Sequence, residues 1–266
     1  MEIPYSRWYS VIPKRRSRRH FDPNRPIEPG SLAALERVCR EFRPFPHARA
    51  CLVNEPAKDV FKGIAGGYGK VRGAPAFIAF IGDMAAPSVQ EEVGYTGEGI
   101  ILEATALGLN TCWVAGFFRP ETVASLIEIK SHERVLSVTP VGYSSGFESL
   151  GEKLMTGFGL THRRLSLSKL VSGWPVDNPP EWARVSLEAA RMAPSAVNRQ
   201  PWGFEVDGNG ITVTVRTGGP EMNVAKRLDC GIAMLHIEVA ASDSGIRGIW
   251  EPLEAPRVTR FSPANT

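Results

Sequence analysis

The strongest constraint on the fold of this chain is that its two halves carry the same order of segments. In the first half, a long run with helical spacing from Gly97 to Leu109 is followed by Trp113. In the second half, a similar run from Asp229 to Gly245 is followed by Trp250. Each half also opens with a Pro-containing segment, a shorter helical run and a strand-like run. The matching order indicates a degenerate internal duplication, with a chance likeness between two amphipathic helices as the alternative.

The remaining segments predict a mixed fold with one main boundary. Apolar residues at helical spacing predict shorter helices over Ser31–Phe42 and Trp182–Met192. Runs rich in β-branched and aromatic residues predict strands over Ala50–Val53, Ala76–Ile81, Val135–Val141, Gly203–Val206 and Ile211–Arg216. The helices and strands do not follow a regular βαβ order, so the α+β class is favoured over a doubly wound sheet. The Pro-rich stretch from Ser172 to Pro180 divides a first half, residues 1–171, from an abbreviated second half, residues 172–266.

Composition excludes several classes of protein. With 43% hydrophobic and 22% charged residues, the chain is too apolar for a disordered protein. No apolar run approaches the roughly 18 residues that a membrane helix needs, and the N-terminus lacks the apolar core of a secretory signal. The cysteines lie far apart, without a C-x-x-C pair or a histidine at ligand spacing: Cys39, Cys51, Cys112 and Cys230. We therefore expect a cytoplasmic protein with no disulfide framework, no metal site and no membrane segment.

The most specific segment is the loop APSAVNRQPW, from Ala193 to Trp202, which follows a predicted helix. Pro194 ends that helix, and Ser195 and Asn198 can form hydrogen bonds from the loop. Gln200 offers an acceptor and two donors in one plane, and the tryptophan adds a large flat face. Such a loop suits recognition of a planar heterocycle with donors and acceptors along its edge. The alternative is a helix stop with a buried tryptophan.

A second candidate segment is the basic run RRSRRHF, from Arg15 to Phe21. In an extended conformation Arg15, Ser17 and Arg19 project from one face, and Arg16 and Arg18 project from the other. Arginine binds phosphate through two parallel hydrogen bonds, so one face of the run can hold a phosphate or a polar chain. The alternatives are a solvated basic arm and a nucleic-acid-binding tail, although such a tail is typically longer and richer in lysine.

Together these segments resemble signature motifs of the flavin-dependent nitroreductase family. R-R-S-x-R-x-F lies near the N-terminus, and A-P-S-x-x-N-x-Q-P-W follows a helix in the second half. A third stretch, ALGLNTCWVAGFF from Ala106 to Phe118, is similar to a further motif of that family. The resemblance implies a nitroreductase-like fold that binds FMN.

The distribution of the motifs is similar to a subgroup in which one chain imitates the usual homodimer. The first and third motifs lie in the first half, and the APS loop lies only in the second half. At the corresponding place the first half has FRPFPHAR, from Phe42 to Arg49, without the polar residues of the loop. The resemblance therefore implies two degenerate repeats in an intrachain pseudo-dimer, with one intact FMN site and one degenerate site.

The resemblance also assigns residues to places around FMN. Those implied at the phosphate, ribityl chain and pyrimidine edge are Arg15, Arg16, Ser17 and Arg19. Those implied along the isoalloxazine, from the second half, are Pro194, Ser195, Ala196, Asn198 and Gln200. Backbone N–H groups near flavin N5 are implied for Ala115 and Gly116. Side chains that complete the phosphate site are implied for Arg163 and Arg164. A less specific match places Tyr68 to Lys70 at the flavin edge.

The function implied is an FMN-dependent oxidoreductase that passes electrons from NAD(P)H through bound flavin to a small organic acceptor such as a nitro compound or quinone. The flavin carries this chemistry, so we expect no catalytic side chain, and we interpret the five histidines as structural. No G-x-G-x-x-G motif follows a strand, so NAD(P)H is expected as a transient substrate. The alternative is a flavin- or small-molecule-binding protein whose catalytic site has decayed. We expect no nucleic-acid or membrane partner, and the pseudo-dimer allows a monomeric protein.

Overall fold

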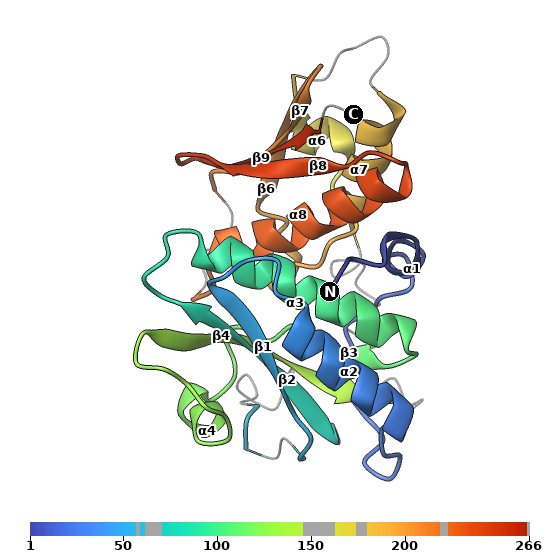
Figure 1. Ribbon diagram of the computed structural model, residues 1–266, viewed down its shortest axis with the longest axis vertical. Helices are drawn as coiled ribbons and strands as arrows, with labels where there is room; N and C mark the ends of the chain where they lie inside the picture. The colour runs from blue at the N-terminus through green and yellow to red at the C-terminus, as the bar shows by residue number, and fades with distance from the viewer. Residues whose placement is uncertain (57–58, 62–70, 146–162, 174–179, 219–222, 265–266) are drawn as a thin grey trace.

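The computed structural model describes the chain except for residues 57–58, 62–70, 146–162, 174–179, 219–222 and 265–266. Two sheets lie on either side of two long central helices (Figure 1). The first sheet has the order β1-β2-β4-β3, formed by Ala48–Val53, Ala76–Asp83, Glu133–Gly142 and Asn110–Thr111 respectively. The second has the order β5-β6-β7-β9-β8, formed by Val171–Ser172, Trp202–Asp207, Gly210–Val215, Arg257–Pro263 and Gly248–Pro252.

The central helices are α3 (Val89–Ala106) and α8 (Lys226–Asp243). Two amphipathic helices, α2 (Pro29–Glu41) and α7 (Glu181–Arg191), pack against α3 and α8 respectively. The shorter helices are α1 (Tyr5–Tyr9), α4 (Pro120–Ala124) and α6 (Leu167–Leu170), with a 3-10 turn at Ala196–Asn198.

The two sheets repeat one topology, which confirms the predicted α+β class with two degenerate repeats. The first half passes through β1, β2, α3, β3 and β4, and the second passes through β6, β7, α8, β8 and β9. The spatial order is shared as well, because β1-β2-β4-β3 corresponds to β6-β7-β9-β8. The central helices α3 and α8 both have 18 residues. The second sheet gains β5 at its edge, where Val171 pairs in parallel with Phe204.

The two halves meet where α3 packs against α8 (Figure 1). A Cβ atom at Gly94 of α3 would lie 2.0 Å from the carbonyl oxygen of Leu228. A Cβ atom at Gly231 of α8 would lie 2.0 Å from the carbonyl oxygen of Glu91. These reciprocal contacts describe a pseudo-two-fold axis between the helices. Because only glycine lacks a Cβ, the two glycines allow the backbones to approach this closely and set how the halves dock.

Burial of the central helices explains the largest difference from the sequence prediction. Helix α3 begins at Val89, eight residues before the predicted start at Gly97. Its first turns contain polar residues, which a one-sided apolar pattern assigns to a loop. Those residues are buried with partners instead, since Arg227 Nε of α8 donates to Glu91 Oε2 over 2.9 Å. The polar character of the segment therefore reflects contact between the halves.

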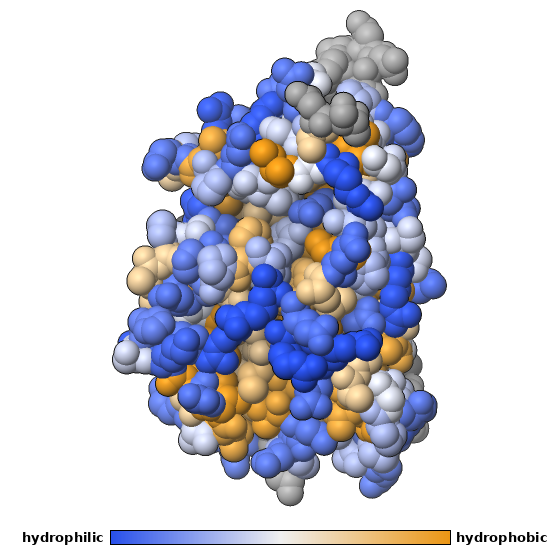
Figure 2. Space-filling model, viewed as in Figure 1, coloured by the Kyte–Doolittle hydropathy of each residue, from blue (hydrophilic) through white to orange (hydrophobic). Residues whose placement is uncertain are grey.

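The other predicted helices and strands are confirmed with small shifts at their ends, but the C-terminal strands β8 and β9 were not predicted. These strands pair antiparallel, with Trp250 opposite Phe261. Each of them ends in a proline, and proline in a run argues against a strand. All four cysteines are free. Within the described ranges, no helix is both long enough and apolar enough to cross a membrane. Hydrophilic residues cover much of the face shown in Figure 2, and hydrophobic ones show between them in its lower half.

Candidate functional site

The basic run lies along the edge of the first sheet. Ser17 forms a parallel bridge with Thr111 of β3, and the Arg18 N–H donates to the Thr111 carbonyl over 2.8 Å. The run is therefore extended at this point. Arg15 is buried, whereas Arg16 is exposed and its guanidinium donates to the Arg15 carbonyl over 2.8 Å. Of these two adjacent arginines, Arg15 therefore lies in the interior and Arg16 at the surface.

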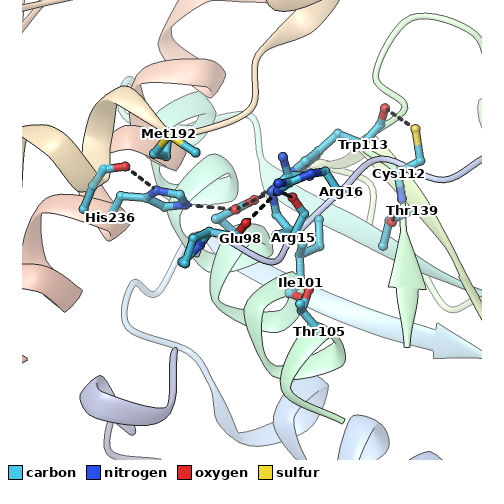
Figure 3. A network of polar contacts seen from close by, with 12 residues as sticks. Arg15, Arg16, Glu98, Ile101, Thr105, Cys112, Trp113, Thr139, Met192 and His236 are labelled. Atoms are coloured by element: carbon cyan, nitrogen blue, oxygen red, sulfur yellow. Dashed lines mark hydrogen bonds and ion pairs between the residues drawn. The ribbon is translucent and has the colours of Figure 1, made fainter. Parts of the chain in front are cut away.

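Arg15 faces a buried polar network that spans both halves (Figure 3). Its Nε lies 3.8 Å from Oε1 of Glu98 in α3, which is beyond hydrogen-bond distance. Trp113 Nε1 donates to Glu98 Oε2 over 2.7 Å, and His236 Nε2 of α8 lies 3.0 Å from Glu98 Oε1. The other ring nitrogen, His236 Nδ1, lies 2.8 Å from the carbonyl oxygen of Ala189 in α7. The network thus joins the first and third motifs to the helix that precedes the APS loop.

Two arginines, the buried Arg15 and the half-buried Arg164, lack a full set of partners for their guanidinium groups. Among the described residues, neither Arg15 Nε nor Arg164 Nε has a hydrogen-bond partner. Burial lowers the pKa of Arg15, and the nearby Glu98 carboxyl opposes this effect. Burial, followed by repulsion from Arg15 and Arg16, lowers the pKa of Arg164 to about 10. An anion stabilises cations that lie close together and are partly removed from water, so this cluster has the character of an anion-binding site.

The APS loop has a left-handed backbone that its own polar side chains hold in place. Val197, Asn198 and Gln200 have φ angles of 46°, 56° and 46°, a region that residues other than glycine seldom adopt. Ser195 Oγ accepts a hydrogen bond from the Gln200 N–H over 2.9 Å. Gln200 Oε1 accepts from the Leu165 N–H over 2.9 Å, and the side chain is buried. In this structure Ser195 and Gln200 therefore build the loop.

Arg164 ties the tail of the first half to this loop. Its Nη1 donates to Asn198 Oδ1 over 2.6 Å, and its Nη2 donates to the Met192 carbonyl over 3.3 Å. The Arg163 carbonyl accepts from Asn198 Nδ2 over 3.0 Å and from Gln200 Nε2 over 3.1 Å. Arg163 itself is exposed, so it contributes through its backbone. Arg164 thus contacts the loop through its side chain, and Arg163 contacts it through its backbone carbonyl.

The third motif reaches the loop through Val224, just before α8. A Cβ atom at Gly116 would lie 3.5 Å from the Val224 side chain, and Arg199 Nη2 donates to the Val224 carbonyl over 3.0 Å. Arg199 Nε also donates to Asp229 Oδ2 over 2.8 Å, and Asp229 Oδ1 accepts the Ala196 N–H over 3.1 Å. Burial raises the pKa of Asp229 to about 6, although the charge of Arg199 opposes the rise. This buried ion pair anchors the loop to the start of α8.

The turn at Ala115 and Gly116 offers backbone donors. Among the described residues, neither of these N–H groups donates a hydrogen bond. The neighbouring Phe117 is 40% exposed, and Val197 of the APS loop is 63% exposed. Exposed apolar side chains and open N–H groups together suit contact with a flat, partly polar ligand.

The structure places the predicted site residues in two groups. One group forms or adjoins the connected cluster described above: Arg15, Arg16, Ser17, Ala115, Gly116, Arg164, Ser195, Ala196, Asn198 and Gln200. The other group is linked less directly: the Arg19 carbonyl accepts from the Arg72 N–H, Arg163 acts through its backbone, and Pro194 is buried. Tyr68 to Lys70 lies outside the described residues.

Four residues of the cluster were not singled out from the sequence: Glu98, Arg199, Asp229 and His236. A usable signal existed for His236, because it is the one polar residue in the apolar run from Ile232 to Ile237, whereas Glu98 lies among glycines and carried no such signal. A lone ionisable residue in such a run indicates a buried partner. Arg199 and Asp229 lie in different segments, and nothing in the sequence pairs them.

The first half fills the place that corresponds to the APS loop with aromatic packing. Phe42 follows α2 and is 1% exposed, with its ring edge-on to Trp8 at a centroid distance of 5.1 Å. Phe45 packs in the same way on Tyr95, also at 5.1 Å. The first residue of the segment from Phe42 to Arg49 thus belongs to the hydrophobic core. In the described part of the chain, no group of His, Cys, Asp and Glu could hold a metal ion.

Comparisons with known proteins agree with this geometry. A family model described as "Putative TM nitroreductase" matches residues 8–241. The structure of a "putative nitroreductase" from Thermotoga maritima superposes with a TM-score of 0.65 and 19% identity, over 96% of this chain and 93% of that chain. A nitroreductase family protein from Clostridium difficile has a TM-score of 0.46 and 21% identity, over 62% of this chain and 96% of that chain. A nitroreductase with bound FMN from Bacteroides fragilis has a TM-score of 0.42 and 17% identity, over 54% and 91%. No curated protein matches the sequence.

The likeness to the Thermotoga maritima structure extends over nearly the whole of both chains and supports the fold. The family match spans most of the chain and contains all three motifs, from Arg15 to Trp202. The chain therefore belongs to the nitroreductase family that this model describes.

Proposed function

We propose that this protein binds one FMN per chain and acts as an FMN-dependent oxidoreductase that takes electrons from NAD(P)H and passes them to a small organic acceptor. The observation that carries the proposal is the pair of guanidinium groups of the buried Arg15 and the half-buried Arg164, each with a buried Nε that lacks a hydrogen-bond partner among the described residues. These groups lie beside a loop and a turn that expose apolar side chains and N–H donors. Membership of the nitroreductase family supports the same assignment.

The residues present fit FMN in their charge and in the polar groups that they offer. The charges of Arg15, Arg16 and Arg164 suit a phosphate, because guanidinium groups bind phosphate oxygens in pairs. The backbone of Ala115 and Gly116 and the left-handed turn at the APS loop suit a flat ring with polar edges. Bound FMN would supply the hydride chemistry, and the side chains would orient it and exclude water.

Within the APS loop, the proposed roles differ between residues. Ser195, Asn198 and Gln200 hold the loop in its left-handed conformation and present its backbone to the ligand. Pro194 stiffens the entry to the loop, and Ala196 is fixed by its N–H bond to Asp229. On this assignment the loop is prepared for the ligand before binding, which lowers the entropy lost on binding.

We further propose that the two repeats are residues 1–171 and 172–266, so that one chain takes the place of a dimer and functions as a monomer. The crossing of α3 and α8 at Gly94 and Gly231 supports this division, because it buries the face along which two chains would otherwise meet. The aromatic packing around Phe42 supports a single intact site.

The test of the activity is a steady-state assay on FMN-reconstituted protein. NADH and NADPH are each supplied with a quinone or a nitroaromatic acceptor, and oxidation of the nicotinamide is followed by absorbance. Acceptor-dependent oxidation above that of free FMN supports the proposal. Tight FMN binding without turnover would favour the flavin-binding alternative instead.

A further inference from the structure

A buried acid–histidine pair, Glu98 and His236, lies directly behind Arg15 (Figure 3). The side chains of Glu98 and His236 are 0% and 1% exposed. They come from the two central helices, one from each half. The pair therefore links the candidate anion site to the interface between the repeats.

The hydrogen-bond geometry fixes how many protons the pair carries. The Ala189 carbonyl can only accept, so His236 Nδ1, 2.8 Å away, must carry a proton. His236 Nε2 lies 3.0 Å from Glu98 Oε1, and without a proton between them two lone pairs would face each other. One further proton therefore lies between the imidazole and the carboxyl. Whichever atom holds that proton, the pair has no net charge.

The number of protons on the Glu98–His236 pair determines how much negative charge lies next to Arg15. If Glu98 were an isolated carboxylate, it would be the natural counter-ion of Arg15. A neutral Glu98–His236 pair does not compensate the guanidinium fully, and the 3.8 Å separation is too long for a hydrogen bond. The Glu98 oxygens are also engaged elsewhere, since Oε2 accepts from Trp113 Nε1 over 2.7 Å. The unpartnered Arg15 Nε agrees with this account.

We propose that His236 neutralises the Glu98 carboxyl through the shared proton and so leaves the charge of Arg15 to an anionic ligand. The inference rests on the proposed function for the identity of that ligand, FMN. His236 is in this sense a positioning residue, because it acts on the ligand only through Glu98 and Arg15.

The first test is Glu98→Gln, which copies a protonated glutamate. The amide oxygen can accept from Trp113, and the amide nitrogen can donate to His236 Nε2, so every hydrogen bond of the network has a replacement. We expect this variant to fold and to bind FMN with a dissociation constant within about threefold of the wild type. A loss of binding of roughly tenfold or more would show that an ionised Glu98 is needed, and would overturn the proposal.

The second test removes the shared proton while keeping the carboxyl. In His236→Gln the new amide can donate to Glu98, but it cannot hold the shared proton as an imidazole does, so a Glu98 carboxylate is no longer neutralised and pairs with Arg15. We expect FMN binding to weaken by roughly tenfold or more, since a charge-assisted hydrogen bond to the ligand is weakened. Adding Glu98→Gln to this variant should restore binding. A purely structural role for His236 predicts no such rescue, so a double variant as weak as the single one would contradict the proposal.

A spectroscopic readout keeps this test separate from that of the proposed function. If the wild type binds no FMN, the proposed function fails, and the inference is judged on the ligand-free protein alone. Nitrogen NMR of ¹⁵N-histidine-labelled protein, assigned with His236→Gln, should show Nδ1 protonated and Nε2 sharing a proton with Glu98. An Nδ1 without a proton, or an Nε2 without a hydrogen-bonded proton, would overturn the inference.

Discussion

The close crossing of the central helices predicts that one chemical change has opposite effects at two positions. Gly231→Ala places a methyl group 2.0 Å from the Glu91 carbonyl oxygen, a rigid backbone atom. Gly30→Ala adds the same methyl group in the first turn of α2, where a Cβ would meet nothing within 4 Å. Both changes gain helix propensity, so they differ only in the space available.

The magnitude follows from the contact distance. Ordinary contacts of a Cβ begin near 3.4 Å, so the Gly231 variant must move α3 and α8 apart by more than 1 Å at their crossing. Overpacking of this kind destabilises a protein by about 1–3 kcal/mol, and the gain in propensity returns about 1 kcal/mol. Because the methyl group meets a rigid backbone atom, the cost lies in the upper part of this range, and we expect Gly231→Ala to lose about 1–2 kcal/mol net, or roughly 2–8 °C in Tm for a chain of this size. Gly30→Ala should gain up to about 1 kcal/mol.

The free energies of unfolding of Gly231→Ala and Gly30→Ala are measured by urea titration on matched samples, with circular dichroism as the signal. Gly94→Ala is a second test of the same helix crossing, because its methyl group would meet the Leu228 carbonyl oxygen at the same 2.0 Å. This variant should lose a similar free energy of unfolding. If Gly231→Ala were as stable as Gly30→Ala, the helices would not cross at this point. Docking of the two halves through α3 and α8 at these glycines would then be wrong.

Three further predictions concern the site and its surroundings. Arg164→Met should weaken FMN binding roughly tenfold to a hundredfold in a fluorescence titration, because a charge-assisted contact from a half-buried side chain is removed, whereas Arg163→Met, at an exposed side chain, should bind nearly as the wild type does. Val197→Gly should raise the free energy of unfolding by about 1 kcal/mol, because it relieves a φ of 46° at a β-branched residue; an unchanged or lower value would argue against strain there. The hydrogen bond from Arg49 lowers the pKa of Glu133 from 4.5 to about 2, so this carboxylate stabilises the fold above pH 4.5 and loses that effect as the pH falls towards 2. Between those pH values the wild type should lose about 1–2 kcal/mol relative to Glu133→Gln, since water near the surface screens part of the full effect, and parallel pH profiles of the two proteins would contradict the assignment.

Local patterns made the architecture of this chain predictable. The helical runs ending in glycine and followed by Trp113 and Trp250 indicated two repeats, and the shared strand order of the two sheets confirms the repeats. The start of α3 was not predictable in the same way. Its polar residues are buried against the other half, and a pattern read along one segment cannot reveal a partner such as Arg227, far away in the chain.

The candidate site was predictable as motifs but not as a network. The basic run and the APS loop stood out because they resemble motifs of one family, and the family match spans both of them. His236 interrupts an apolar run, yet only the packing of α3 on α8 shows that it meets Glu98. The role of Gln200 also depended on tertiary structure, since its buried amide holds the loop through Leu165.

The proposed function depends above all on one FMN being held in a site built from both halves of the chain. The most informative experiment is to count flavin per chain after reconstitution with FMN and removal of the excess, from the visible absorption spectrum and from the flavin released on denaturation. We predict about one flavin per chain. Two per chain would contradict the degenerate second site, and no bound flavin at any FMN concentration would contradict the proposed function itself.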